Sequence, residues 1–172
     1  MNDTYVDYEH FGKRPTGYTN LSPSERSALM SKIRSKDTKP EMLVRRYLHA
    51  MGLRYRLHDT SLPGKPDLVL PARRVVIFVQ GCFWHCHGAT CSIRPGKPRT
   101  NPEKWEAKLL GNVARDERHQ SALREAGWRV LTIWECELKR AVRGATLHRL
   151  LNDILATGEP SMGWDDELAL AA

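Results

Sequence analysis

Five candidate metal ligands lie within ten positions of the chain, directly after a strongly apolar run. Zinc prefers four thiolate or imidazole ligands in a tetrahedron, and closed sets of this kind are structural. So dense a group of thiols and imidazoles therefore predicts a structural zinc site. The five residues are Cys82, His85, Cys86, His87 and Cys91.

The identity of the fourth zinc ligand is left open by the spacing. Cys82, His87 and Cys91 are the natural local three, and the fourth is either Cys86 or Cys136, which follows a later apolar strand. If that strand lies beside the one that precedes the cluster, Cys136 would reach it. The metal would then join distant parts of the chain and stabilise the fold. The alternative is a set of buried cysteines without metal, with histidines at the surface.

His85 is interpreted as free of zinc and as the candidate general acid or base. An imidazole titrates near neutral pH and can transfer protons there. Asp116, on a predicted long helix, could orient this imidazole through a carboxylate–imidazole bond. The residues alone favour the alternative, in which Asp116 is a surface partner of Arg115 or Arg118. Spacing alone would also allow His85 to be a fifth zinc ligand.

Asp67 follows Pro66 at the mouth of an apolar strand, where an unpaired charge would be costly to bury. Mg²⁺ would offset that cost and could activate water for phosphodiester hydrolysis. The usual nuclease pattern of Pro-Asp, a strand, then an acid, one residue and Lys lacks its second half, because Phe78-Val79-Gln80 stands there. The main-chain carbonyl of Val79 could act as a ligand instead. Glu41 could add a carboxylate, although a capping-box position explains it equally well.

Two adjacent aromatic residues, Phe83 and Trp84, lie within the candidate zinc segment. Neighbours in an extended loop point to opposite sides, so both cannot easily be buried. One or both could wedge between base steps, as apolar side chains do in proteins that kink DNA. Trp105 on the next helix could join them, or it could be an ordinary core residue.

The composition indicates one globular domain and a negatively charged partner. The chain has 172 residues, of which 41% are hydrophobic, enough for a single core. Its 27 Lys and Arg against 20 Asp and Glu give a net charge of +7. This excess favours nucleic acid, with a basic solvated face as an equal alternative. No secretory signal or membrane span is recognised, so we expect a reducing cytoplasm, where cysteines favour metal binding over disulfides.

The apolar periodicity predicts an α/β fold, with a small mixed sheet flanked by helices. We expect an N-terminal arm over 1–20, a single domain over 21–157 and a C-terminal tail over 158–172. The run 75–79 is apolar on both faces and should be central in the sheet. The expected helices cover Ser24 to about Lys36, 38–52, 101–127 and 146–156, and the expected strands cover 53–57, 67–70, 75–79 and 128–134.

Several side chains receive more specific predictions from the helix patterns. The first helix is basic, and its Arg26 and Lys32 are candidate DNA contacts. The second helix carries an apolar stripe that includes Met51, and Leu110 is among the positions of the long helix expected to face inward.

The motifs together resemble one family, the very-short-patch repair (Vsr) endonucleases, a divergent branch of the PD-(D/E)xK nucleases. The resemblance covers about residues 22 to 156, and the Gly-Cys-Phe-Trp-His string followed by Trp-Glu-Cys is its most specific part. It is carried by Arg26-Ser27, Met30, Ile33, Thr38-Lys39-Pro40-Glu41, Ser61 to Asp67, Ile77-Phe78, Gly81 to His85, Asn112-Val113, Arg115-Asp116, Gly127 to Leu131 and Trp134-Glu135-Cys136.

The resemblance implies a restriction-endonuclease-like core and a DNA nickase. It would act at T·G mismatches left by deamination of 5-methylcytosine and cut 5′ of the mismatched thymine. The resemblance also implies a monomer that works with the mismatch-repair protein MutL, and an N-terminal helix that reaches the minor groove. It assigns Mg²⁺ to Asp67 and the Val79 carbonyl, acid–base chemistry to His85 supported by Asp116 and Glu41, zinc to Cys82, His87, Cys91 and Cys136, and intercalation to Phe83, Trp84 and Trp105.

Two departures from the family pattern leave alternatives open. Val79 stands where the best-known members carry Thr, which is harmless if only the carbonyl is used. The spacing from His87 to Cys91 is longer than in those members, so Cys86 remains a rival zinc ligand. Two other functions also remain: a non-catalytic, zinc-stabilised DNA-binding module for distorted duplexes, and a restriction-type nuclease that cuts fully paired DNA.

Overall fold

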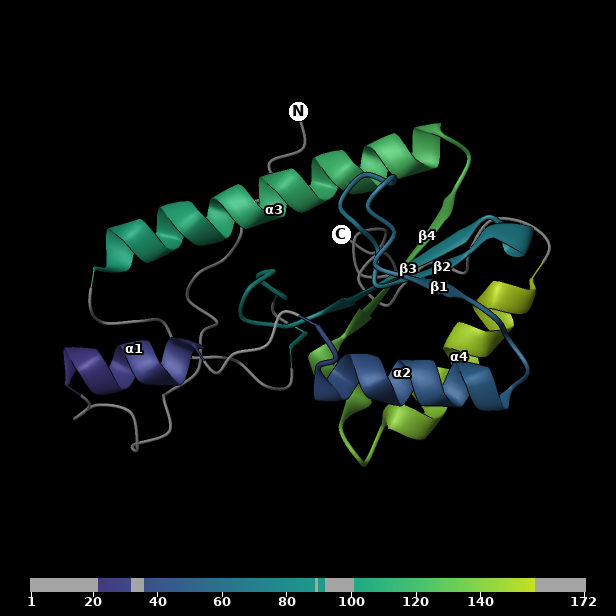
Figure 1. The fold of residues 1–172 in the computed structure, drawn as a ribbon, viewed down its shortest axis with the longest axis horizontal. Helices are drawn as coiled ribbons and strands as arrows, with labels where there is room; N and C mark the ends of the chain where they lie inside the picture. The colour runs from purple at the N-terminus through teal and green to yellow at the C-terminus, as the bar shows by residue number, and fades with distance from the viewer. Residues whose placement is uncertain (1–21, 32–35, 89, 92–100, 157–172) are drawn as a thin grey trace, which may run out of the picture.

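The computed structural model describes residues 22–31, 36–88, 90–91 and 101–156, and within them the predicted strands form one sheet (Figure 1). The predicted arm over 1–20, the tail over 158–172 and Lys32 lie outside the described residues. None of the helices in the described ranges is both long enough and apolar enough to cross a membrane.

Four strands are arranged in the order β1-β2-β3-β4. β1 pairs with β2 and β2 with β3 in antiparallel fashion, whereas β3 and β4 are parallel, with Gln80 aligned to Trp134 at their ends. The mixed sheet and the central place of β3 are therefore confirmed. The strands are β1 (Arg56–Leu57), β2 (Leu68–Leu70), β3 (Val75–Gln80) and β4 (Arg129–Trp134).

β1 has only two residues, fewer than the five predicted over 53–57. Its partner β2 is itself short, because Pro66 and Pro71 stand close to either end and proline has no N–H to donate to a ladder. Leu53, which was expected in this strand, instead packs into the core just after the second helix.

The described residues form four α-helices, of which α2, α3 and α4 flank the sheet, and two short 3₁₀ helices that follow β2 and β4. A reciprocal pair of hydrogen bonds between Ser22 and Glu25 caps the first helix, as in a capping box. The last helix begins three residues before the predicted Thr146. The bounds are α1 (Pro23–Ser31), α2 (Lys39–Ala50), α3 (Pro102–Glu125), α4 (Arg143–Leu155), η3 (Pro71–Arg73) and η4 (Glu135–Leu138).

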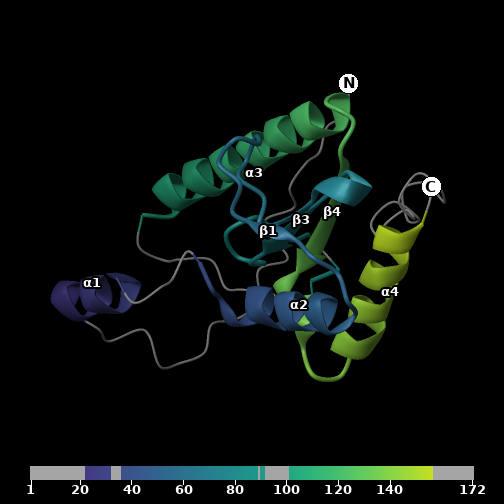
Figure 2. The same cartoon turned by 45° about the vertical axis from the view of Figure 1, so that its right-hand side comes forward.

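The helices form one layer on each face of the sheet: α2 and α4 cover one face and α3 covers the other (Figures 1 and 2). Side chains alternate between the two faces along each strand. In β3, Val75 and Ile77 contribute to the core under α2 and α4, whereas Val76 packs with Leu123 of α3. Both faces of β3 are therefore buried, which fits its continuous apolar sequence.

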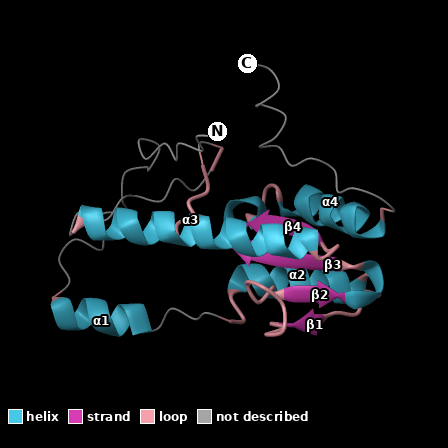
Figure 3. Cartoon of the chain, turned by 90° about the horizontal axis from the view of Figure 1, so that it is seen from above, coloured by secondary structure: helices cyan, strands magenta, loops and turns pink. Residues whose placement is uncertain are grey.

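Two side chains that were expected to face inward are exposed. Met51 is 48% exposed, because it follows the last turn of α2 as its C-cap and lies beyond the buried stripe. Leu110 is 42% exposed, whereas its neighbour Leu109 is buried. The N-terminal half of α3 extends past the edge of the sheet (Figure 3), so it has less buried surface than a helix that packs along its whole length.

The turn before β2 packs closely against α3. Gly64 has a φ of +70°, and a Cβ added there would lie 2.9 Å from the Cβ of His119. Glycine accepts this conformation without strain, and its missing side chain allows the close approach. This contact fixes the chain that leads into Asp67 relative to the helix that carries Asp116.

Replacing Gly64 with Ala should therefore lower the free energy of unfolding by roughly 1–2 kcal/mol from the left-handed backbone alone, and by more from the contact with His119. Chemical denaturation would measure the loss. Gly111→Ala on α3 is the matched control, because nothing lies within 4 Å of an added Cβ there and Ala favours a helix by about 1 kcal/mol over Gly. A Gly64→Ala variant as stable as the control would contradict this packing.

Candidate active site and metal cluster

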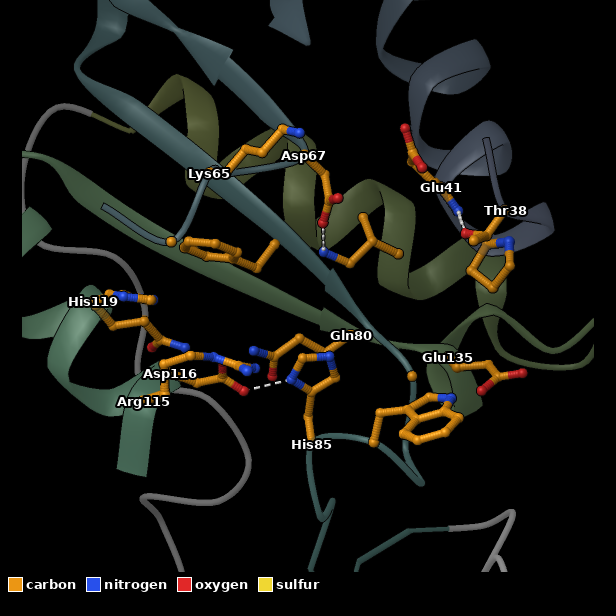
Figure 4. Close-up of a pocket in the computed structure, with 17 residues that line it drawn as sticks. Thr38, Glu41, Lys65, Asp67, Gln80, His85, Arg115, Asp116, His119 and Glu135 are labelled. Carbon is orange, nitrogen blue, oxygen red and sulfur yellow. Dashed lines mark hydrogen bonds and ion pairs between the residues drawn. The ribbon is translucent and has the colours of Figure 1, made fainter. Parts of the chain in front are cut away.

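A pocket of about 580 Å³ opens where the parallel strands β3 and β4 end (Figure 4). Ligand sites in open α/β sheets commonly lie at the carboxyl ends of strands. The pocket brings together the first turn of α2, the turn before β2, the end of β3 and the middle of α3. Its polar lining residues include Glu41, Lys65, Asp67, Gln80, His85, Arg115, Asp116, His119 and Glu135.

Asp67 is the residue directly before β2, and it lines this pocket. Its Oδ2 accepts a hydrogen bond of 2.7 Å from the main-chain N–H of Val79 (Figure 4). Burial raises the pKa of the Asp67 carboxyl, and the nearby Glu41 raises it further, against the lowering effects of the Val79 N–H and of His58 and His85. The net pKa is raised, so the pocket holds a carboxylate whose charge is incompletely compensated by the protein.

Glu41 lies in the first turn of α2 and is 2% exposed. Its main-chain N–H donates to the hydroxyl of Thr38 at 3.4 Å, which is the predicted N-cap. Its carboxylate lies 3.2 Å from His58 Nε2 and 3.3 Å from a guanidinium nitrogen of Arg45. Capping therefore uses the Glu41 main chain, so the capping-box position does not account for its carboxylate, which is part of the residue that lines the pocket.

His85 and Asp116 form a direct pair across the pocket, with Nδ1 and Oδ2 2.5 Å apart (Figure 4). Asp116 also accepts a hydrogen bond from Arg115 at 3.1 Å. Burial raises the pKa of Asp116, but the hydrogen bond and charge of His85, together with Arg115, lower it more, so its pKa is lowered. An ionised Asp116 can hold the imidazole through Nδ1 and leave Nε2 for proton exchange.

The four residues Cys82, His87, Cys91 and Cys136 form a cluster that could hold a metal ion, with all ligand atoms within 4.8 Å of one another. The Nδ1 of His87 lies 3.2 Å from the Cys136 thiol and 3.6 Å from the Cys82 thiol. All three cysteines are at most 5% exposed. Burial raises the pKa of the Cys82 thiol, so these thiols fit a site in which a cation, and not the solvent, stabilises the thiolates.

The pairing of β3 with β4 explains why Cys136 belongs to this cluster. Gln80 is aligned with Trp134, so Cys82 and Cys136 each follow the aligned ends by two residues. Cys86 is placed elsewhere: its φ is +50°, and its half-buried thiol has a pKa raised by burial and by the charge of Asp116. The structure thus favours Cys136 over Cys86 as the fourth ligand.

A second layer of contacts orients the cluster. The His87 ring stacks on Trp134 with centroids 4.1 Å apart, and its Nε2 lies 3.4 Å from the hydroxyl of Thr90. Metal-binding imidazoles usually have such a partner for the second nitrogen. On the η4 side, Glu137 accepts the main-chain N–H of Trp134 at 2.8 Å and pairs with Arg149 at 2.6 Å.

The three aromatic residues singled out in the sequence form one group, of which Trp84 lines the pocket. The ring of Phe83 lies 5.0 Å from that of Trp84 and 5.7 Å from that of Trp105. The ammonium of Lys108 lies within 5.3 Å of both indole rings, and Asn112 donates to the Trp84 carbonyl at 2.9 Å. All three rings are partly exposed and stand outside the main core, which favours the wedge interpretation for Trp105. Arg26 belongs to α1.

Sequence reasoning missed His58 and Gln80. Gln80 is buried and lines the pocket at the end of β3. The sequence marks it only as the residue that stands where the usual nuclease pattern has lysine. The side chain of His58 contacts Glu41, and its backbone has a φ of +48°. No spacing in the sequence indicates that contact.

Comparison with known proteins shows which proteins this chain is similar to. A family model of the DNA mismatch endonuclease Vsr matches residues 19–91. The type II nicking enzyme V.XorIIP of Xanthomonas oryzae is 49% identical over 132 residues, 77% of this chain and 93% of that protein. The DNA mismatch endonuclease Vsr of Escherichia coli is 46% identical over 114 residues, 66% of this chain and 71% of that protein.

A third relative, the type II nicking enzyme V.NmeAIP of Neisseria meningitidis, is 42% identical over 78% of this chain and 94% of its own length. The class of protein defined by the fold, the pocket and these relatives is a DNA endonuclease. The chain belongs to the Vsr family of DNA mismatch endonucleases. The alternative of a non-catalytic DNA-binding module is therefore set aside.

Replacement of Cys136 by Ser should remove most of the bound metal and lower the free energy of unfolding by several kcal/mol, because metal binding is coupled to folding. Elemental analysis and thermal unfolding would measure the two effects. Cys86→Ser is the matched control and should retain the metal. Metal loss from the Cys86 variant, with full retention in the Cys136 variant, would reverse the assignment.

Replacement of Asp67 by Asn should raise the Tm of the protein by a few degrees at neutral pH without added divalent cations. Because the folded-state pKa of Asp67 is raised, its ionisation costs stability above the unfolded-state pKa. The amide oxygen can still accept the Val79 N–H, so the hydrogen bond is kept. The gain in Tm should shrink as the pH falls and both states become protonated. An Asn variant that is less stable at neutral pH would contradict the assigned cost.

Proposed function

We propose that this enzyme nicks one strand of duplex DNA 5′ of the thymine in T·G mismatches that arise by deamination of 5-methylcytosine, with Mg²⁺ as its catalytic metal. The observation that carries the proposal is the pocket itself. There, Asp67, the end of β3 and the His85–Asp116 pair converge beside a partly exposed group of three aromatic rings. The E. coli relative is named a DNA mismatch endonuclease.

The proposed ligands for Mg²⁺ are Asp67 and the main-chain carbonyl of Val79. The N–H of Val79 donates to Asp67, and in an antiparallel pair the N–H and C=O of one residue face the same neighbouring strand. The register of β2 and β3, extended by two residues, sets Pro66 opposite Val79. Proline cannot donate to a facing carbonyl, which supports the Val79 oxygen as a ligand. When bound there, Mg²⁺ would polarise the scissile phosphate and activate water.

The proposed proton-transfer residue is His85. Its Nδ1 is held by Asp116, so Nε2 can exchange a proton with the attacking water or the leaving oxygen. Asp116 fixes the orientation of the ring. Glu41 adds a second carboxylate on the Asp67 side of the pocket.

We assign Zn²⁺ to Cys82, His87, Cys91 and Cys136, as a structural ion. Three thiols and one imidazole form a closed set that leaves no position for a substrate. The segment between Cys82 and His87 holds Phe83, Trp84 and His85, so the ion would fix the residues that contact the DNA without entering the reaction.

DNA binding is proposed to use Phe83, Trp84 and Trp105 as a wedge between base pairs. A mismatched step is easier to open than a paired one, so a wedge favours mismatched DNA. The net charge of +7 supports binding to the phosphates, and α1 with Arg26, together with Lys32, is proposed to reach the minor groove. We further propose that the enzyme acts as a monomer and that MutL is its partner.

A nicking assay with both strands labelled would test the proposed function. With Mg²⁺, a pool of T·G duplexes varied at the flanking positions should be cut in the T strand only, directly 5′ of the thymine, and the same pool with C·G pairs should stay intact. His85→Ala should slow the reaction roughly 100-fold or more. Asp67→Ala should abolish the reaction, because it removes a metal ligand, but the Asp67→Ala variant should still bind DNA.

Two results would overturn the proposal. Cleavage of both strands in a plasmid without mismatches would show a restriction-type nuclease instead. Tight binding of the T·G pool with no cutting in any sequence context would show that the mismatch is not the substrate for cleavage.

A further inference from the structure

His58 contacts both the backbone and the side chains of the proposed catalytic centre, but it is not among the residues that line the pocket. It follows β1 with a φ of +48°, and its main-chain N–H donates to the Asp67 carbonyl at 3.3 Å. A left-handed conformation is unfavourable for a residue with a side chain and is kept when its surroundings require it. His58 is thus tied to Asp67 through the backbone before its imidazole is considered.

The imidazole of His58 stands between the buried carboxylate of Glu41 and the partly buried carboxylate of Asp67. Its Nε2 lies 3.2 Å from Glu41 Oε1, and its Nδ1 lies 3.8 Å from Asp67 Oδ1. The contact with Glu41 is the closer of the two, and the distance to Asp67 is too long for a hydrogen bond. The side chain is 15% exposed, so water has little access to this arrangement and does not readily replace it.

The partners of Glu41 show why this contact matters. A carboxylate that is 2% exposed needs hydrogen bonds to stay charged. Besides His58, Glu41 contacts Arg45 of its own helix, and Arg45 also pairs with Asp37, which lies just before α2, at 2.5 Å. The contact with His58 comes from the side of β1 and Asp67. It is therefore the interaction that sets the position of Glu41 relative to Asp67.

We propose that His58 is a positioning residue for divalent-cation binding, and this rests on the proposed function. The contact of its Nε2 with Glu41 holds that carboxylate beside Asp67. The two acids are then arranged to share the hydration shell or the coordination sphere of one cation. His58 itself touches neither substrate nor cation, and it acts through Glu41.

The two nitrogens of His58 can be tested separately. The amide nitrogen of Gln can take the place of Nε2, whereas that of Asn can take only the place of Nδ1. His58→Gln should therefore keep the contact with Glu41, while His58→Asn and His58→Ala should lose it. The Gln and Asn variants carry the same amide group on side chains of different length. A difference between them therefore reports the position of the nitrogen and not merely its presence.

The experiment measures Mn²⁺ binding to the full-length, zinc-loaded protein on a T·G duplex whose scissile linkage cannot be hydrolysed, with free Mn²⁺ read by electron paramagnetic resonance. We expect the Asn and Ala variants to bind Mn²⁺ about 10- to 100-fold more weakly, and the Gln variant to bind like the natural protein. Affinity for the duplex without Mn²⁺ should be unchanged in all three. Asp67→Asn serves as the control that loses the cation site.

The possible results separate the inference from the proposed function. Natural protein that binds no Mn²⁺ above the Asp67→Asn control would overturn the metal site, and the role of His58 would fall with it. If the natural protein binds Mn²⁺ and all three His58 variants bind it equally well, only the role of His58 is overturned. Full binding by Asn with weak binding by Gln would overturn the assigned contact with Glu41. Thermal unfolding of Gln and Asn variants at the same Tm would exclude a simple folding effect.

Discussion

The closed set of three thiols and one imidazole is the constraint on which the rest of the site depends. A metal ion bound to the cluster would fix the chain at both Cys82 and His87, and turn hydrogen bonds to the carbonyls of Gly81 and Cys82 hold the residues between. Phe83, Trp84 and His85 thus receive defined positions without a core of their own. A short loop could not supply this rigidity through hydrophobic burial, whereas a bound cation can.

The sheet brings the remaining groups to this loop from distant parts of the chain. β3 ends at the loop and provides Val79, the turn that packs on α3 provides Asp67, and α3 returns Asp116 to His85. The parallel pairing with β4 adds Cys136 at the matching position. Glu41, which is buried, and Asp67, which is partly buried, lie on one side of the pocket. The raised pKa of Asp67 means that its charge costs stability in the absence of a cation.

Much of this arrangement could be predicted from the sequence, because its signals are local. The apolar run of β3 marks a central strand, the Thr38 cap marks the start of α2, and the density of thiols and imidazoles marks the metal cluster. The spacing alone could not decide between Cys136, which the family resemblance assigned, and Cys86, because that choice depends on the register of β3 with β4.

His58 was missed for the same kind of reason, since its role arises from a left-handed backbone and a contact with another element. The residues alone favoured an arginine neighbour as the partner of Asp116 over His85. In the structure Asp116 contacts both His85 and Arg115. Met51 and Leu110 fit the helical pattern of apolar residues, but both lie where no neighbouring element in the described part of the chain covers them, so they are exposed.

The central claim is that the cluster metal is a scaffold and that the reaction takes place at Asp67 and His85. The most direct test replaces the cluster zinc by Cd²⁺, verifies full occupancy by elemental analysis, and compares single-turnover nicking rates at a fixed Mg²⁺ concentration. Cd²⁺ also accepts tetrahedral thiolate ligands but is a different Lewis acid. The account predicts equal rates for the two forms. A fully loaded, folded Cd²⁺ form that nicks about tenfold or more slowly would contradict it and place the cluster metal in the reaction.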